Sequence, residues 1–166
     1  MKRPVQRLLT KIKKSKRSIG VVLGWTATIT LIIIATHQSF YITEEAFSTY
    51  KIPYLTYKGP IFTDLGNLLL LVAGAIAGIL IADVKTMIYG YFAAMFLSFS
   101  SALIYVFLYI WYPLELGSVL SEIPFGWELA LFMAFGNVFR FLIPFGLVFS
   151  LLGLLAGNFL KTLLMP

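Results

Sequence analysis

Four long apolar stretches, separated by short polar segments, dominate the hydrophobic pattern of the chain. They cover about 19–36, 65–82, 88–111 and 129–159. A helix needs about 20 apolar residues to cross the hydrocarbon core of a bilayer. Strands of a membrane barrel alternate apolar and polar residues instead, whereas these stretches are continuous. The pattern therefore predicts an all-α fold, an integral membrane four-helix bundle formed by residues 18–166.

Composition agrees with a membrane protein. Of the 166 residues, 60% are hydrophobic and 12% are charged, and the mean hydropathy is +0.91. Soluble domains carry about 25% charged residues, because their surfaces must remain hydrated. A soluble globular domain and a disordered chain are therefore excluded.

Residues 1–17 form a basic segment with eight lysines and arginines. Its apolar residues follow the i, i+3, i+4, i+7 spacing of one helical face: Val5, Leu8, Leu9 and Ile12. This spacing predicts an amphipathic helix. We expect it to bind anionic lipid headgroups of the cytoplasmic leaflet rather than nucleic acid. The alternative is a disordered basic tail that only sets the topology.

The basic residues also predict the orientation. With the N-terminus inside, the basic segment, Lys85 and Lys161 are cytoplasmic, and only Lys51 and Lys58 lie outside. The acids fall mostly on the outer side: Glu44, Glu45, Asp64, Glu115, Glu122 and Glu128. The positive-inside rule then places both termini in the cytoplasm of a cell-membrane protein. The short link at 83–86 predicts that the second and third stretches are antiparallel neighbours.

Two of the stretches carry small residues at helical spacing. Gly74 and Gly78 form a GxxxG motif in the second stretch. The fourth has a similar stripe: Gly146, Ser150, Gly153 and Gly157. Small residues allow membrane helices to approach closely. We favour packing inside the bundle, and homo-oligomerisation or membership of a larger membrane complex is the alternative.

The third stretch carries polar residues three or four positions apart. They are Ser98, Ser101, Tyr105, Tyr109 and Tyr112. Such a face can form hydrogen bonds between helices, which is the interpretation we favour. It can also line a water-filled path or a ligand pocket.

Arg140 lies deep in the fourth stretch, roughly 18 Å along a helix from Glu128. A charge there costs at least about 2.5–3.5 kcal/mol. Asn137 lies one turn before it, and Pro144, which removes the hydrogen bond to the Arg140 carbonyl, one turn after. We predict a kink beside Arg140. Its side chain either pairs inside the protein or binds an anionic ligand.

The chain contains no cysteine and one histidine, His37, at the outer end of the first stretch. Thiol chemistry, disulfides and cysteine-based metal sites are thereby excluded, and no metal or cofactor is expected. An ordinary interfacial histidine is expected at this position, because metal binding would require further ligands from other loops.

No motif of a known reaction is present. Phosphate-binding glycine loops, HExxH and GxSxG are missing from the sequence. We expect a non-enzymatic accessory or scaffold subunit of a membrane complex. The alternative is an oligomeric small transporter or channel that selects an anionic or polar solute through Arg140. An intramembrane enzyme that acts on lipid is a third possibility.

Overall fold

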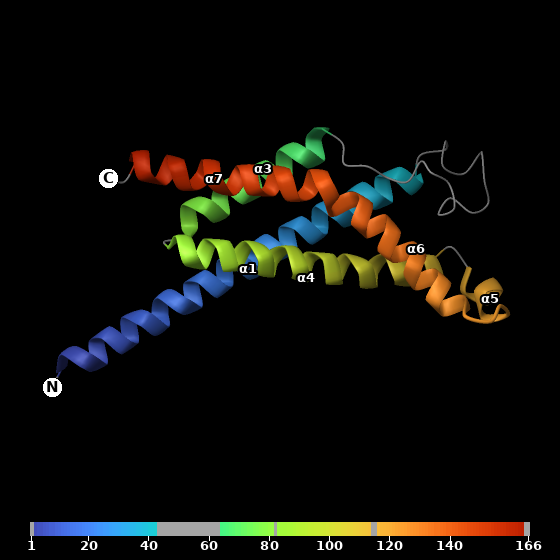
Figure 1. Cartoon of the computed structure of the whole chain (residues 1–166), viewed down its shortest axis with the longest axis horizontal. Helices are drawn as coiled ribbons and strands as arrows, with labels where there is room; N and C mark the ends of the chain where they lie inside the picture. The colour runs from blue at the N-terminus through green and yellow to red at the C-terminus, as the bar shows by residue number, and fades with distance from the viewer. Residues whose placement is uncertain (1, 43–63, 82, 114–115, 165–166) are drawn as a thin grey trace.

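The structure, a computed structural model, describes residues 2–42, 64–81, 83–113 and 116–164, and these ranges contain no strand. The elements in chain order are α1 (Lys2–Ile42), α3 (Asp64–Leu80), α4 (Val84–Trp111), α5 (Leu116–Ser121), α6 (Gly126–Phe141), the π-helical turn η2 (Leu142–Gly146) and α7 (Leu147–Leu164). The prediction of an all-helical chain is confirmed (Figure 1).

Three of the described helices are long and apolar enough to cross a membrane. The crossing segments are Ser18–Gln38 within α1, Val84–Trp111 and Leu147–Leu164, and α3 is a shorter apolar helix. Their outer faces are apolar too, with large side chains such as Leu31, Phe96 and Leu164 exposed. A soluble monomer rarely exposes so much apolar surface, whereas lipid accommodates it.

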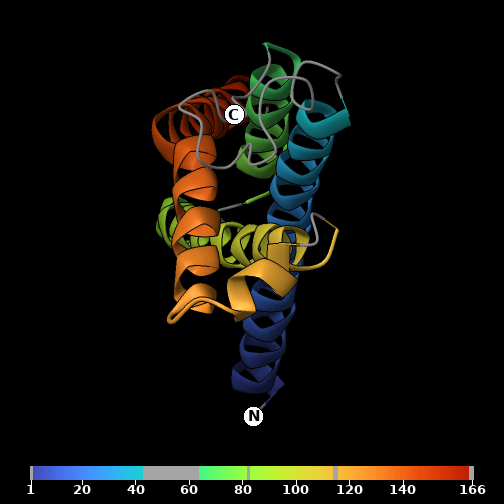
Figure 2. The ribbon, with the colours of Figure 1, turned by 90° about the vertical axis from the view of Figure 1, so that its right-hand side faces the viewer.

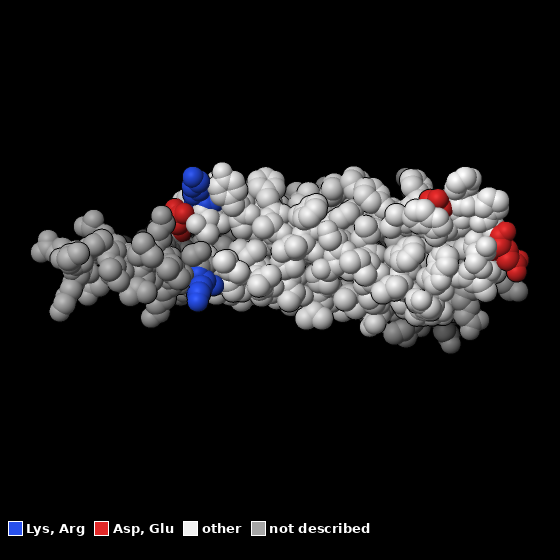
Figure 3. All heavy atoms as spheres, turned by 90° about the horizontal axis from the view of Figure 1, so that it is seen from below, with Lys and Arg blue, Asp and Glu red and all other residues white. Residues whose placement is uncertain are grey.

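The charged side chains of the described residues lie mainly at the two ends of the molecule. Lysines gather with one acid at the end where α4 begins, and acids occupy the opposite end (Figure 3). The first group is Lys16, Asp83, Lys85 and Lys161, and the second is Asp64, Glu122 and Glu128. Arg140 lies in the last turn of α6, between Glu128 and Lys161 in the chain. Lys51, Lys58, Glu44, Glu45 and Glu115 are outside the described residues.

The helices make a ring of contacts. The most extensive one joins α3 to α7, while α1 packs against both α3 and α4, and α4 packs against α6. Figure 2 shows α4 between α1 and α6, and α3 between α1 and α7. The prediction that the second and third stretches pack side by side is therefore wrong. Although only a short link joins α3 to α4, α3 turns away from it to pack on α7.

The basic segment belongs to the same helix as the first apolar stretch. Helix α1 runs without interruption from Lys2 to Ile42, and its N-terminal part extends beyond the other helices (Figure 1). No break marks the predicted boundary at residue 17. The apolar face predicted from Val5 to Ile12 lies outside the described side chains.

The fourth stretch, predicted as one kinked helix over 129–159, is divided in two. Ile143 has the extended conformation φ −118°, ψ 126°, so α6 ends before it and α7 begins after η2. The cause is Pro144, because proline disfavours a helical conformation in the residue that precedes it and cannot donate a backbone hydrogen bond. The predicted kink is confirmed, and Figure 1 shows the change of direction between α6 and α7.

Small side chains fill the faces where α4 and α6 are buried. On α4 one row of buried residues recurs every four positions: Ala94, Ser98, Ala102, Val106 and Ile110. On α6 the same spacing gives Ala130, Ala134 and Val138. Ridges of residues four apart are a common way for two helices to interlock. The polar pattern of the third stretch did not predict these buried alanines.

Candidate functional site

The predicted small-residue faces of α3 and α7 meet each other. A methyl group added to Gly74 would overlap the carbonyl oxygen of Ser150, and one added to Gly78 would overlap that of Leu154. The fit is reciprocal, since Gly153 lies on the Leu71 carbonyl and Gly157 on the Ala75 carbonyl. The two backbones are therefore in direct contact at four glycines.

The glycines of this contact pack two helices of the same chain against each other. Gly74, Gly78, Ser150, Gly153 and Gly157 are all buried between α3 and α7. Gly146, in η2, is buried as well. Side chains any larger than hydrogen would hold the helices apart, and in lipid the gain from association comes from such close packing. The packing interpretation therefore accounts for these residues, and homo-oligomerisation would need another surface.

Two long-range hydrogen bonds tie α7 to its neighbours near its two ends. Lys161 Nζ donates to the Ile81 carbonyl oxygen at 2.7 Å, just beyond the C-terminus of α3. A cation at this position also offsets the partial negative charge of a helix end. At the other end of α7, the Tyr91 hydroxyl of α4 donates to the Leu147 carbonyl at 3.0 Å. Neither residue was among the predicted site residues.

The polar residues of α4 do not share one environment. Ser98 is fully buried, and its Oγ donates to the Thr26 carbonyl of α1 at 3.2 Å. Ser101 is exposed, and Tyr105 is half-buried. The predicted hydrogen bonding between helices is therefore found at Ser98. Ser101 is not part of that contact.

His37 is buried rather than interfacial, with none of its surface exposed. Its ring lies edge-on to Tyr105 and Tyr109, with centroid distances of 5.5 and 5.0 Å. The expectation of an ordinary interfacial histidine is therefore wrong. The spacing of the two tyrosines, one helical turn apart, was the available signal for an aromatic pocket. Within the described ranges, no three histidine, cysteine or acidic residues are grouped as metal ligands.

Arg140 lies in the last turn of α6, half-buried, directly before the break at Ile143. It interacts with other groups of the chain, and the carbonyl end of a helix stabilises a cation. Asn137 Nδ2 donates back to the Met133 carbonyl at 2.9 Å. Arg140 and Asn137 therefore share a helix, while Ser98 and Tyr105 face α1.

Two grooves lie along α1, and Arg140 lines neither of these two. One lies between α1 and α4, has a volume of about 580 Å³, and opens at the end with the lysines. The other, of about 460 Å³, lies between α1 and α3 beside Gly20, Gly24 and Thr28. Nothing lies within 4 Å of a methyl group added to Gly20 or Gly24. Trp25 also lines this second groove, is 3% exposed, and its indole N–H has no hydrogen-bond partner among the described residues.

Comparison with known proteins finds no matching family model, no similar curated protein and no similar solved structure.

Proposed function

We propose that the chain is a multi-pass protein of the cell membrane that crosses the bilayer four times, as a four-helix bundle with both termini in the cytoplasm. Helices α6 and α7 share the fourth crossing. Helix α3, with 17 residues, is about 26 Å long, close to the roughly 30 Å hydrocarbon thickness. The lysines at one end and the acids at the other support this orientation. The basic segment then meets anionic headgroups of the inner leaflet.

Single cysteines test this topology, because the chain has none of its own. Glu122 and Thr162 are both exposed, at opposite ends of the molecule. A membrane-impermeant maleimide added to intact cells should label Glu122→Cys, and should label Thr162→Cys only after permeabilisation. Labelling of Thr162→Cys in intact cells contradicts the proposed orientation, and labelling of both contradicts the number of crossings.

The function we propose is that of a non-enzymatic accessory or scaffold subunit of a membrane complex. The observation that carries this proposal is the close glycine packing of α3 on α7, supported by the contact of α4 with α6. Such contacts build a rigid body from small side chains.

The surface for a partner is the groove between α1 and α3. Gly20, Gly24 and Thr28 recur every fourth residue there, and the glycines have open space in front of them. The occupant we propose is a membrane helix of another protein with an acidic cytoplasmic flank. A second copy fits less well, because it would bring two basic segments together.

Gly24→Leu tests this surface, and Ala27→Leu is its control. Both positions are exposed on α1, but only Gly24 lines the groove. On native gels of solubilised membranes, the wild-type chain should migrate in an assembly larger than its own 18.6 kDa. Gly24→Leu should reduce that assembly about tenfold, the effect of losing one tight contact, and Ala27→Leu should not. A wild-type monomer, a ladder of 18.6 kDa multiples, or equal effects of both variants would contradict the proposed partner.

One observation favours the second candidate function, an oligomeric transporter for an anionic or polar solute. Transporters commonly bind substrates where a membrane helix is broken, because the helix ends supply partial charges. The break at Ile143 lies three residues after Arg140. The experiment that separates the two functions is substitution of Arg140 itself.

A further inference from the structure

Helix α1 is anchored to the bundle from Trp25 onward. Its buried side chains, among those that the structure describes, all lie in that part: Trp25, Thr26, Ile29, Ile32, Ile33 and His37. The side chains of residues 18–24 are exposed or half-buried. Because few buried contacts mean low local stability, residues 18–23 are held by the other helices less firmly than the part that follows them.

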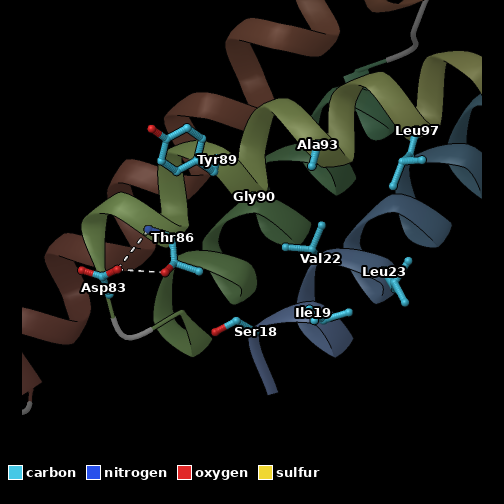
Figure 4. Close-up of a pocket in the computed structure, with 10 residues that line it drawn as sticks. All are labelled: Ser18, Ile19, Val22, Leu23, Asp83, Thr86, Tyr89, Gly90, Ala93 and Leu97. Atoms are coloured by element: carbon cyan, nitrogen blue, oxygen red, sulfur yellow. Dashed lines mark hydrogen bonds between the residues drawn. The ribbon is translucent and has the colours of Figure 1, made fainter. Parts of the chain in front are cut away.

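Two grooves flank residues 18–23 on opposite faces of α1. In the groove toward α4, the α1 wall consists of Ser18, Ile19, Val22 and Leu23. Figure 4 shows this wall opposite Ala93 and Leu97 of α4. In the groove toward α3, the α1 wall consists of Gly20, Val21, Gly24, Trp25 and Thr28. At about 100° per residue, the centres of the two walls lie roughly 160° apart around the helix. A sideways movement of α1 between α3 and α4 therefore narrows one groove and widens the other.

A glycine and a threonine hydroxyl weaken α1 just before its anchored part. A methyl group added to Gly20 or Gly24 would meet nothing within 4 Å, so packing inside the chain does not require glycine at either position. Glycine is a poorer helix former than alanine. In addition, Thr28 Oγ1 donates to the Gly24 carbonyl at 2.9 Å, and such bonds compete with the helical ones and often bend a helix. Gly24 is therefore the point at which α1 bends most easily.

The contacts on the C-terminal side of Gly24 hold the rest of α1 in place during such a bend. The Thr26 carbonyl accepts a hydrogen bond from Ser98 Oγ of α4 at 3.2 Å. The Trp25 ring lies beside that of Tyr91, also of α4, with a centroid distance of 6.0 Å. A bend at Gly24 leaves both contacts intact, because only the residues before it move.

Contacts of the described side chains favour movement toward α3. On the α4 side, Val22 already touches the neighbouring helix, since a methyl group added to Gly90 would lie 2.9 Å from Val22 Cγ2. On the α3 side, Gly20 and Gly24 present no side chain, and the space in front of them is open. A bend at Gly24 therefore narrows the groove toward α3 and widens the one toward α4.

The basic segment supplies a force for this bend. Helix α1 is unbroken from Lys2, so the basic segment and residues 18–23 form one arm, residues 2–23, which extends beyond the other helices (Figure 1). The 16 residues from Lys2 to Arg17 span about 24 Å, whereas a charged surface acts over only about 8 Å in physiological salt. A straight arm keeps most of its basic residues beyond the reach of an anionic leaflet. A bent arm brings them to the headgroups, which attract each of them.

We propose that the arm bends at Gly24 when the inner leaflet is anionic, and that the bend narrows the groove between α1 and α3. Anionic headgroups and the acidic flank of the partner helix attract the same basic residues. Lipid charge therefore competes with the partner: the arm is bent and the groove narrow on an anionic leaflet, and the arm is straight when the partner occupies the groove. This inference rests on the membrane placement and the partner surface proposed above.

Pairs of spin labels test the movement, because the chain has no cysteine of its own. Lys16→Cys is combined with Ile79→Cys on α3 or with Ile88→Cys on α4, and all three positions are exposed. In nanodiscs of phosphatidylcholine, added phosphatidylglycerol should shorten the distance to α3 and lengthen the distance to α4, each by about 4 Å. A bend of roughly 20° over the eight residues from Gly24 to Lys16 gives this shift. Unchanged distances, or two changes of the same sign, overturn the proposal.

Two controls separate a bend at Gly24 from a general response to the lipid. The pair Leu31→Cys with Ile104→Cys, exposed in the anchored part of α1 and on α4, should keep its distance. Gly24→Ala should lower the ratio of bent to straight arms about fivefold, the usual difference between glycine and alanine in a helix. Gly136→Ala, at an exposed glycine of α6 with equally open surroundings, should not. Equal responses of the two alanine variants overturn the hinge.

The competition with the partner is tested on the solubilised assembly. Incubation with phosphatidylglycerol micelles should reduce the assembly seen on native gels severalfold, and phosphatidylcholine micelles should not. A distance shift without any effect of phosphatidylglycerol on the assembly overturns the competition. A wild-type chain that forms no larger assembly contradicts the partner surface instead, and the measured distances then still decide whether the arm bends.

Discussion

Gly78→Leu and Gly157→Leu are each expected to destabilise the purified chain by about 3 kcal/mol or more, the upper range for overpacking of a tight contact. At both positions the added side chain meets backbone of the opposing helix, at Leu154 and Ala75, which cannot rotate away. For a chain of this length, the midpoint of thermal unfolding in detergent should fall by about 6–12 °C.

Gly136→Leu is the matched control for this prediction. Gly136 is exposed on α6, and nothing lies within 4 Å of a methyl group placed there. The same substitution should leave stability unchanged or raise it slightly, because leucine favours a helix more than glycine does. Ala73→Leu, at a half-buried position of α3, should have a smaller effect than Gly78→Leu.

The pattern of these effects tests the contact between α3 and α7. If Gly78→Leu and Gly157→Leu unfold at the same temperature as Gly136→Leu, the two glycine faces are not in contact. If they change the oligomer distribution while the monomer keeps its stability, the glycines join separate chains instead.

The helical secondary structure, the approximate bounds of the helices and the kink could be predicted from the sequence, because each depends on local chemistry. Apolar length set the crossing segments, and Pro144 alone imposed the break at Ile143. The glycine faces were also visible, since Gly74 with Gly78 and Gly153 with Gly157 stand at helical spacing. The contact between these two faces belongs to the tertiary structure, which residue spacing alone cannot specify.

What the sequence did not reveal depended on which helices become partners. A short link was expected to pair α3 with α4, but backbone contact at four glycines outweighs chain proximity and pairs α3 with α7. His37 stood at the end of an apolar stretch, and its contacts with the rings of Tyr105 and Tyr109 come from another helix. Ser98 and Ser101 likewise differ in burial because α1 covers one side of α4.

Arg140→Ala is expected to make the chain easier to insert and harder to keep folded. Removal of the charge abolishes an insertion cost of at least about 2.5–3.5 kcal/mol. It also removes the interactions that half-buried Arg140 makes in the last turn of α6, and groups left unpaired in a low-dielectric site cost about 1–3 kcal/mol. Thermal stability and complex formation should fall in Arg140→Ala. Arg140→Lys should keep part of the wild-type stability and complex formation, because an ammonium cannot reproduce the planar fork of guanidinium.

The same variant separates the accessory subunit from the transporter. In proteoliposomes, an accessory subunit conducts no anion with either Arg140 or alanine at this position, and the loss appears in stability and assembly. A transporter shows anion flux that Arg140→Ala abolishes while the unfolding temperature is kept, because the break at Ile143 is set by Pro144 and not by Arg140. Equal stability, assembly and flux in wild type, Arg140→Ala and Arg140→Lys would remove Arg140 from both functions. The half-buried charge would then have no function of its own, and the carbonyl end of α6 would be what stabilises it.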